Sequence, residues 1–296
     1  MKIYINQDEL DFSFENEKTL GDIYKSIEQW MAPQGFSISE VIINNKEVFL
    51  NKKEDWYDKP FTGSEEIRIM ALSFLELKAD NIKTLLSYTG MVQKALKEGN
   101  LTVLNELLEE YSYIKDSYKL LLDDSGNAIK NHMDMLLETN SFIPEGERSE
   151  QNVISVLEGF IMLEAVIQGR LDEITTPFKA GKDTYDSIQT MLPQMEEVSL
   201  MLQTGKDKDA MEIIIRFSEL FQKLLRIYTN IPEEKISEHR DEIKKFISEM
   251  SGILNELAEA FSTEDSVLMG DLMEYEIMPR MEKFPRFFET FVNKGD

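Results

Sequence analysis

Residues 66–78 read EIRIMALSFLELK, and at about residue 72 the hydrophobic period changes from two to roughly 3.6. Before this point, short alternating runs such as Lys2–Asn6 lie between turn residues. After it, nearly every segment has the spacing of an amphipathic helix. The pattern predicts an α+β protein with a small head at residues 1–72, followed by a large all-α antiparallel helical bundle at residues 73–296. It leaves room for a further division near residues 141–150.

The head combines alternating strands with one amphipathic helix. Thr19-x-x-Asp22 resembles a capping box, which starts a helix by satisfying backbone N–H groups. Pro33 and Gly35 are expected to end that helix. The predicted elements, in order, are strands at Lys2–Asn6 and Glu9–Glu15, a helix from Leu20 to Met31, and strands at Val41–Ile43, Glu47–Leu50 and Ile67–Leu72.

This order resembles the ubiquitin-like β-grasp domain. The resemblance rests on the opening hairpin, the single helix that crosses its face and the closing strand Glu66–Met70, and it covers the head only. Sulfur carriers and protein modifiers of that family end in Gly-Gly, whose carboxylate is activated. Here the closing strand runs into Ser73-Phe74-Leu75-Glu76 and a helix. The resemblance therefore implies docking or scaffolding, without carrier chemistry. The body resembles no family in its sequence pattern.

The body reads as one helix after another with short connections. The predicted helices are Phe74–Lys97, Leu101–Leu122, Asn127–Thr139, Gln151–Ile174, Asp183–Leu202, Asp207–Tyr228, Glu233–Phe261 and Ser266–Val292. Breaks are expected at Pro177, Gly181, Gly205 and Pro232. Pro193 and Pro279 lie inside two predicted helices and are expected to kink or divide them.

Composition excludes several classes of function. The chain carries 56 Asp and Glu against 32 Lys and Arg, a net charge of −24, which repels nucleic acid phosphates and anionic lipid. It has no cysteine, so thiol catalysis, disulfides and cysteine-held metals are excluded. The start, Met1–Asn6, turns polar at once and predicts no signal peptide. No apolar run approaches the roughly 18 residues needed to span a membrane. We therefore expect a cytoplasmic protein.

Catalytic motifs are missing as well. The two histidines, His132 and His239, lack the glutamate three residues earlier that a di-iron bundle needs, since Ile129 and Ile236 stand there. Phosphate-binding glycine loops, a G-x-S-x-G turn and a calcium-binding EF-hand loop are also lacking. We predict that the chain is not an enzyme and has no cofactor.

The stretch Phe246–Pro279 is distinctive, because it contains acids and methionines but no Lys or Arg. In one interpretation the acids are solvated and the methionines fill the core. In another they form an open groove that holds a basic amphipathic helix. A third places Mg²⁺ or Ca²⁺ on Asp271, Glu274 and Glu276. The candidate partner-binding residues are Glu264, Asp265, Met269, Asp271, Glu274, Tyr275 and Met278.

The favoured prediction is a cytoplasmic protein–protein interaction module, acting as an adaptor, scaffold or chaperone-like protein that binds a basic or amphipathic protein segment. Two alternatives stay open: an enzyme with an unrecognised carboxylate or metal site in the bundle, and an acidic mimic of nucleic acid. Binding to nucleic acid or membrane is not expected, and homo-oligomerisation stays open. Abundant Lys, Asn and Ile favour a bacterial source.

Overall fold

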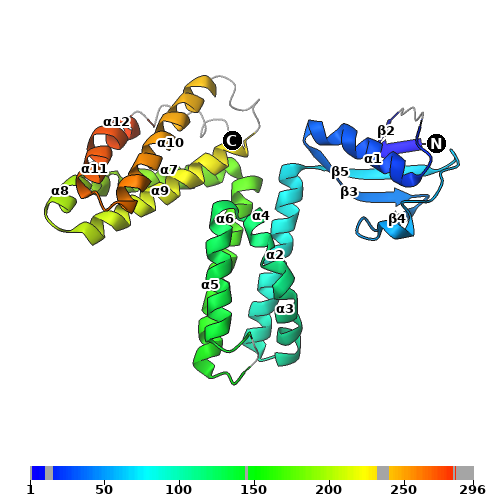
Figure 1. The fold of residues 1–296 in the computed structure, drawn as a ribbon, viewed down its shortest axis with the longest axis horizontal. Helices are drawn as coiled ribbons and strands as arrows, with labels where there is room; N and C mark the ends of the chain where they lie inside the picture. Colours follow the sequence, from blue (N-terminus) through cyan, green and yellow to red (C-terminus); the bar gives the residue numbers. More distant parts are fainter. Residues whose placement is uncertain (1, 11–15, 144–145, 232–239, 283, 285–296) are drawn as a thin grey trace. The chain divides into compact units, whose positions relative to one another are not determined.

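The computed structural model describes residues 2–10, 16–143, 146–231, 240–282 and 284. Contacts between residues divide the chain into two compact units, unit 1 with residues 1–168 and unit 2 with residues 169–296. The described residues form a five-stranded sheet followed by helices, which confirms the predicted α+β class (Figure 1). The predicted domain boundary after residue 72 stays a prediction.

The sheet is mixed and has the strand order β2-β1-β5-β3-β4. Its strands are β1 (Lys2–Ile5), β2 (Asp8–Leu10), β3 (Phe36–Ile43), β4 (Lys46–Val48) and β5 (Glu66–Ser73). The first and last strands pair in parallel, with Ile3 opposite Ile67, and the other pairings are antiparallel. Asn44 and Asn45 turn the second hairpin at positive φ, a conformation that asparagine tolerates better than most residues.

One helix, α1 (Leu20–Met31), packs on the sheet. It begins with the predicted capping box: the Thr19 hydroxyl accepts from the Asp22 backbone N–H at 3.1 Å, and the Asp22 carboxylate accepts from the Thr19 N–H at 2.9 Å. Ile23 and Ile27 are buried with sheet residues such as Ile67, so the periodic stripe faces the sheet. The predicted strand residues Phe12 and Phe14 lie outside the described residues.

Unit 1 continues as a helical bundle of α2 (Phe74–Glu98), α3 (Leu101–Ile114), α4 (Ser117–Leu121), α5 (Gly126–Thr139) and α6 (Glu150–Thr175), the last of which extends into unit 2. A second capping box, between Ser73 and Glu76, starts α2 directly from β5. The Gln93 amide on α2 donates to Glu164 on α6 at 2.6 Å. Gly159 on α6 lies against Leu136 on α5, where a Cβ would be 2.1 Å from a Leu136 methyl group.

By length and composition alone, α6 could cross a membrane. An 18-residue window has a mean hydropathy of 1.4, and 28% of that window is buried. Glu158 and Glu164 interrupt the apolar residues of α6, so the sequence pattern did not indicate a membrane span there. Phe160 and Ile167 are fully buried in the bundle. Core helices of soluble proteins share this composition, so the cytoplasmic location stays a prediction.

Unit 2 comprises α7 (Pro177–Glu196), α8 (Val198–Gln203), α9 (Asp207–Thr229), α10 (Arg240–Ser262), α11 (Ser266–Asp271), a π-helical turn η6 (Leu272–Ile277) and α12 (Met278–Met281). Its core is rich in methionine and phenylalanine. The rings of Phe246 and Phe284 stack with centroids 5.3 Å apart, and Phe217 and Phe221 lie 5.9 Å apart.

Two parts of the helix prediction are wrong. The span Leu101–Leu122 is divided between α3 and α4 at Lys115 and Asp116. The break predicted at Pro177 is present at Thr176, and Pro177 begins α7, since the N–H that proline lacks has no partner in the first turn of any helix. The break predicted at Gly181 is wrong, because Gly181 lies buried inside α7, which begins before the predicted Asp183. Pro193 lies inside α7, which ends three residues later, and the predicted span Asp183–Leu202 is divided between α7 and α8 as expected. Pro279 lies in the first turn of α12, and residues 266–281 continue as helix through α11, the π-helical turn η6 and α12. The predicted ends at Glu233 and Val292 lie outside the described residues.

Candidate functional site

The structure separates the seven predicted partner-binding residues into two groups. Met269 is fully buried, and Met278 is half-buried against the core of unit 2. Met269 is therefore not available to a partner. The other five are exposed along the α10–α11 turn, α11 and η6; they are Glu264, Asp265, Asp271, Glu274 and Tyr275.

The neighbouring methionines are also core residues. Met191, Met195, Met250 and Met273 are at most 2% exposed. They do not line an open groove, and their burial favours the interpretation in which flexible thioethers fill gaps in the core. The exposed acids then lie outside a methionine-filled core, on the solvent side of the same helices.

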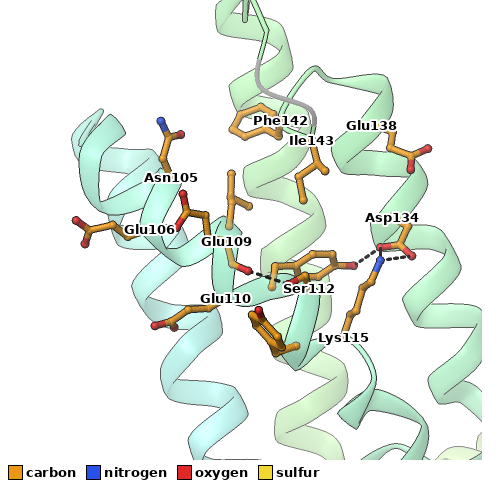
Figure 2. A pocket seen from close by; sticks show the side chains of 13 residues that line it. Asn105, Glu106, Glu109, Glu110, Ser112, Lys115, Asp134, Glu138, Phe142 and Ile143 are labelled. Atoms are coloured by element: carbon orange, nitrogen blue, oxygen red, sulfur yellow. Dashed lines mark hydrogen bonds and ion pairs between the residues drawn. The ribbon is translucent and has the colours of Figure 1, made fainter.

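Sequence reasoning missed a second site, an open cavity of about 940 Å³ in unit 1, which we call the α3–α5 pocket (Figure 2). Two helices and the turn after α5 contribute its side chains. Its lining residues are Asn105, Glu106, Leu108, Glu109, Glu110, Tyr111, Ser112, Tyr113, Lys115, Asp134, Glu138, Phe142 and Ile143.

The helix α3 supplies the acidic wall. Its N-terminus is capped by Asn100, whose side-chain oxygen accepts from the Val103 N–H at 3.3 Å. Glu106, Glu109 and Glu110 follow at i, i+3 and i+4, so their carboxylates share one exposed face. Like charges at this spacing repel each other, so these three glutamates do not stabilise α3.

The floor is a hydrogen-bonded group that joins α3 to α5. The Tyr111 hydroxyl donates to the Asp134 carboxylate at 3.0 Å, and the Lys115 ammonium donates to both oxygens of that carboxylate at 3.1 and 3.2 Å (Figure 2). The Lys115 ammonium also lies 5.7 Å from the Tyr111 ring centroid. Burial, the neighbouring Tyr118 and the bond to Asp134 raise the pKa of Tyr111, so its hydroxyl stays protonated.

The rim is formed where α5 ends. The Phe142 backbone N–H donates to the Leu137 carbonyl at 2.9 Å, which turns Phe142 and Ile143 back toward the pocket (Figure 2). The Arg148 guanidinium lies 4.4 Å from the Phe142 ring centroid and donates to the Ser141 carbonyl at 3.1 Å. These contacts hold the rim in place, and Ile143 adds an aliphatic side chain to the acidic lining of the pocket.

The charges of the pocket are unbalanced. Among the lining residues that the structure describes, Lys115 carries the single positive charge, and Asp134 already pairs with it. The other four carboxylates form no ion pair within the described part of the chain; they are Glu106, Glu109, Glu110 and Glu138. The pocket therefore favours a cationic ligand.

A metal centre has no support in the described residues, where no group of three or more His, Asp or Glu side chains is placed to share an ion. This includes Asp271, Glu274 and Glu276, the residues of the third interpretation of the acidic stretch. His132 is exposed on α5, and His239 lies outside the described residues. That the chain is not an enzyme stays a prediction.

Two family models match parts of the chain. The model described as TP0873 N-terminal domain matches residues 1–73, which end at the last residue of β5. The model described as a domain of unknown function (DUF8042) matches residues 180–286, within unit 2. The chain is similar to each over less than half of its length. No curated protein matches the chain, and no solved structure matches it. The α3–α5 pocket lies between the two matched segments.

Proposed function

We propose that the chain is a protein-interaction module that binds a basic segment of a partner protein in the α3–α5 pocket. The observation that carries this proposal is the set of four carboxylates without a cation around a cavity with an aromatic floor. A Lys or Arg side chain fits this chemistry, because its charge meets the glutamates while its aliphatic stem packs on the exposed Tyr113 ring and on Ile143.

Electrostatics gives the expected strength. A cation about 4 Å from one carboxylate gains on the order of 1 kcal/mol in water and about 4 kcal/mol at a protein surface of lower polarity. The free carboxylates on α3 and α5 add to this attraction. They also raise the association rate, which falls when salt screens the charges over a Debye length of about 8 Å at physiological ionic strength.

We further propose that the head is a ubiquitin-like β-grasp domain. Its strand order, its single helix on one face and the parallel pairing of β1 with β5 support this. Since β5 continues into the capped helix α2, no free tail leaves the sheet for activation. The head then serves docking, as an adaptor or scaffold would require, and not carrier chemistry.

The test compares two triple variants that lose the same charge. The first is Glu106→Gln, Glu109→Gln and Glu110→Gln in the pocket, and the control is Glu212→Gln, Glu256→Gln and Glu259→Gln on exposed positions of unit 2. Each is titrated with a synthetic peptide of alternating Lys and Leu, and association is followed by fluorescence anisotropy at low and high salt.

The pocket variant should lose at least about tenfold in affinity, and the control should lose little. Rising salt should slow association with the wild-type chain and have less effect on the pocket variant. If both triples bind the peptide equally well, total charge and not the pocket governs binding, and the proposal fails.

A further inference from the structure

The exposed residues of α11 and η6 include three large apolar side chains within nine positions. Val267 is 75% exposed, Leu268 is 41% exposed and Tyr275 is 63% exposed. Single exposed apolar residues are ordinary on protein surfaces, but these share one side of a helix with two acids. The full set is Val267, Leu268, Asp271, Glu274 and Tyr275, which we call the α11–η6 face.

The spacing of this face is that of a contact surface. Counted from Val267, its members lie at i, i+1, i+4, i+7 and i+8, which is the pattern of one helix side. The opposite side holds the fully buried Met269, Met273 and Ile277, so the helix already packs on the core without the outward residues. The core therefore does not require that Val267 and Leu268 be apolar.

The π-helical turn keeps this arrangement through Pro279. The Met278 N–H donates to the Met273 carbonyl, a bond five residues long that widens the turn ahead of the proline. Asp265 caps the start of α11 by accepting from the Leu268 N–H at 3.0 Å. Both ends of the face are thus fixed by backbone geometry, and π-helical turns often occur at functional sites.

We propose that the α11–η6 face is a docking surface for a basic amphipathic helix of a partner protein. Its charge selects this occupant, since residues 246–279 contain no Lys or Arg and the face itself carries two carboxylates. A second copy of the chain would bring the same acids into a two-fold contact, where they repel. A basic helix instead neutralises Asp271 and Glu274 while its apolar side covers Val267, Leu268 and Tyr275.

This inference is independent of the α3–α5 pocket, and a local probe separates the two surfaces. The chain has no cysteine, so one introduced cysteine accepts one dye. An environment-sensitive dye at Ser266→Cys reports on the α11–η6 face, and the same dye at Ser112→Cys reports on the pocket. The ligand is a synthetic helical peptide of about 18 residues with Leu on one side and Lys on the other. A matched peptide carries Glu in place of Lys.

The Lys peptide should give a saturable signal at the Ser266→Cys dye, and the Glu peptide should give none. Val267→Ser with Leu268→Ser should weaken that binding about tenfold, as truncation of contact residues does. The matched control is Leu120→Ser with Ile215→Ser, which are also exposed apolar positions.

Asp271→Asn with Glu274→Gln should weaken binding as well, against Glu256→Gln with Glu259→Gln as its control. All the substituted positions are exposed except the label site Ser266. Circular dichroism spectra check that each variant is folded.

Three results would overturn the proposal. The first is the absence of a saturable signal at the Ser266→Cys dye. The second is an equal response to the Glu peptide, and the third is an equal loss in the control variants. A signal at the Ser112→Cys dye alone would leave the pocket as a binding site and remove the α11–η6 face.

Discussion

Glu173 is the best place to test how burial sets the strength of an ion pair in this protein. Its carboxylate is 5% exposed and lies 3.1 Å from the Arg170 guanidinium and 3.2 Å from that of Arg226. The exposed pair of Lys182 and Asp186 is closer, at 2.6 Å, but its side chains are 51% and 55% exposed. If distance alone decided the strength of an ion pair, the Lys182–Asp186 pair would be the stronger. If desolvation decides it, the pairing of Glu173 is the stronger.

We expect Glu173→Gln to lower the free energy of unfolding of unit 2 by about 3 kcal/mol. Removing one partner of a buried pair costs about 3–5 kcal/mol, because charges stay buried without compensation. We take the lower end, since the Arg226 side chain is 28% exposed and can recover some hydration. The loss corresponds to a fall of about 10 °C in the melting temperature. Lys182→Gln should cause no measurable change.

Urea unfolding measures both variants with two probes. Far-ultraviolet circular dichroism follows the helices, while both tryptophans, Trp30 and Trp56, lie in the head and report on it separately. Glu173→Gln should shift the dichroism transition. A loss below about 1 kcal/mol, or an equal loss in Lys182→Gln, would refute the argument that burial decides the strength of this pair.

Four further predictions concern single positions. Burial and a hydrogen bond to Glu28 raise the pKa of Tyr24 to about 12. The folded head then holds that proton more tightly than the unfolded chain, so this stabilisation is complete below about pH 10 and is lost as the pH rises toward 12. Tyr24→Phe should reduce the alkaline loss, measured by tryptophan fluorescence. Gly126→Ala should destabilise unit 1 by about 1–3 kcal/mol, because its Cβ would lie 2.2 Å from the Tyr118 carbonyl oxygen. Gly90→Ala, with nothing within 4 Å, should stabilise unit 1 by about 0.5–1 kcal/mol; urea unfolding checks both. Glu110→Gln should stabilise α3 by a few tenths of a kcal/mol in thermal melts, since it removes repulsion from Glu106, and should weaken binding of the basic peptide.

Local signals predicted the head well. The capping box at Thr19 and Asp22 and the change of period near residue 72 depend on neighbours in sequence, and the structure confirms both. The prediction Val41–Ile43 missed the first part of β3, because a bulge between Ile38 and Glu40 breaks the period-two alternation on which the prediction relied. The start of α7 was missed because proline both begins and breaks helices, and only the structure shows which it does at Pro177.

The pocket could not be found in the same way. Glu106, Glu109 and Glu110 are visible as an acidic face, but the chain has many such faces. What makes this one a pocket is Asp134 on another helix, which meets Tyr111 and Lys115 through antiparallel packing. The burial of Met269 and Met273 could have been predicted from the sequence. Their spacing of four places them on one side of a helix together with Leu272 and Ile277, which marks the core side.

The surplus of acid has two physical roles, and they respond to salt in opposite directions. Even if every one of the 32 basic residues were paired, 24 of the 56 acids would have no partner, and their repulsion destabilises the compact state. Screening this repulsion should therefore raise stability as salt increases. Carboxylates that serve binding should do the reverse and lose affinity for the basic peptide over the same range. If affinity and stability rose together with salt, apolar contact would dominate at both surfaces, and their carboxylates would serve solubility alone.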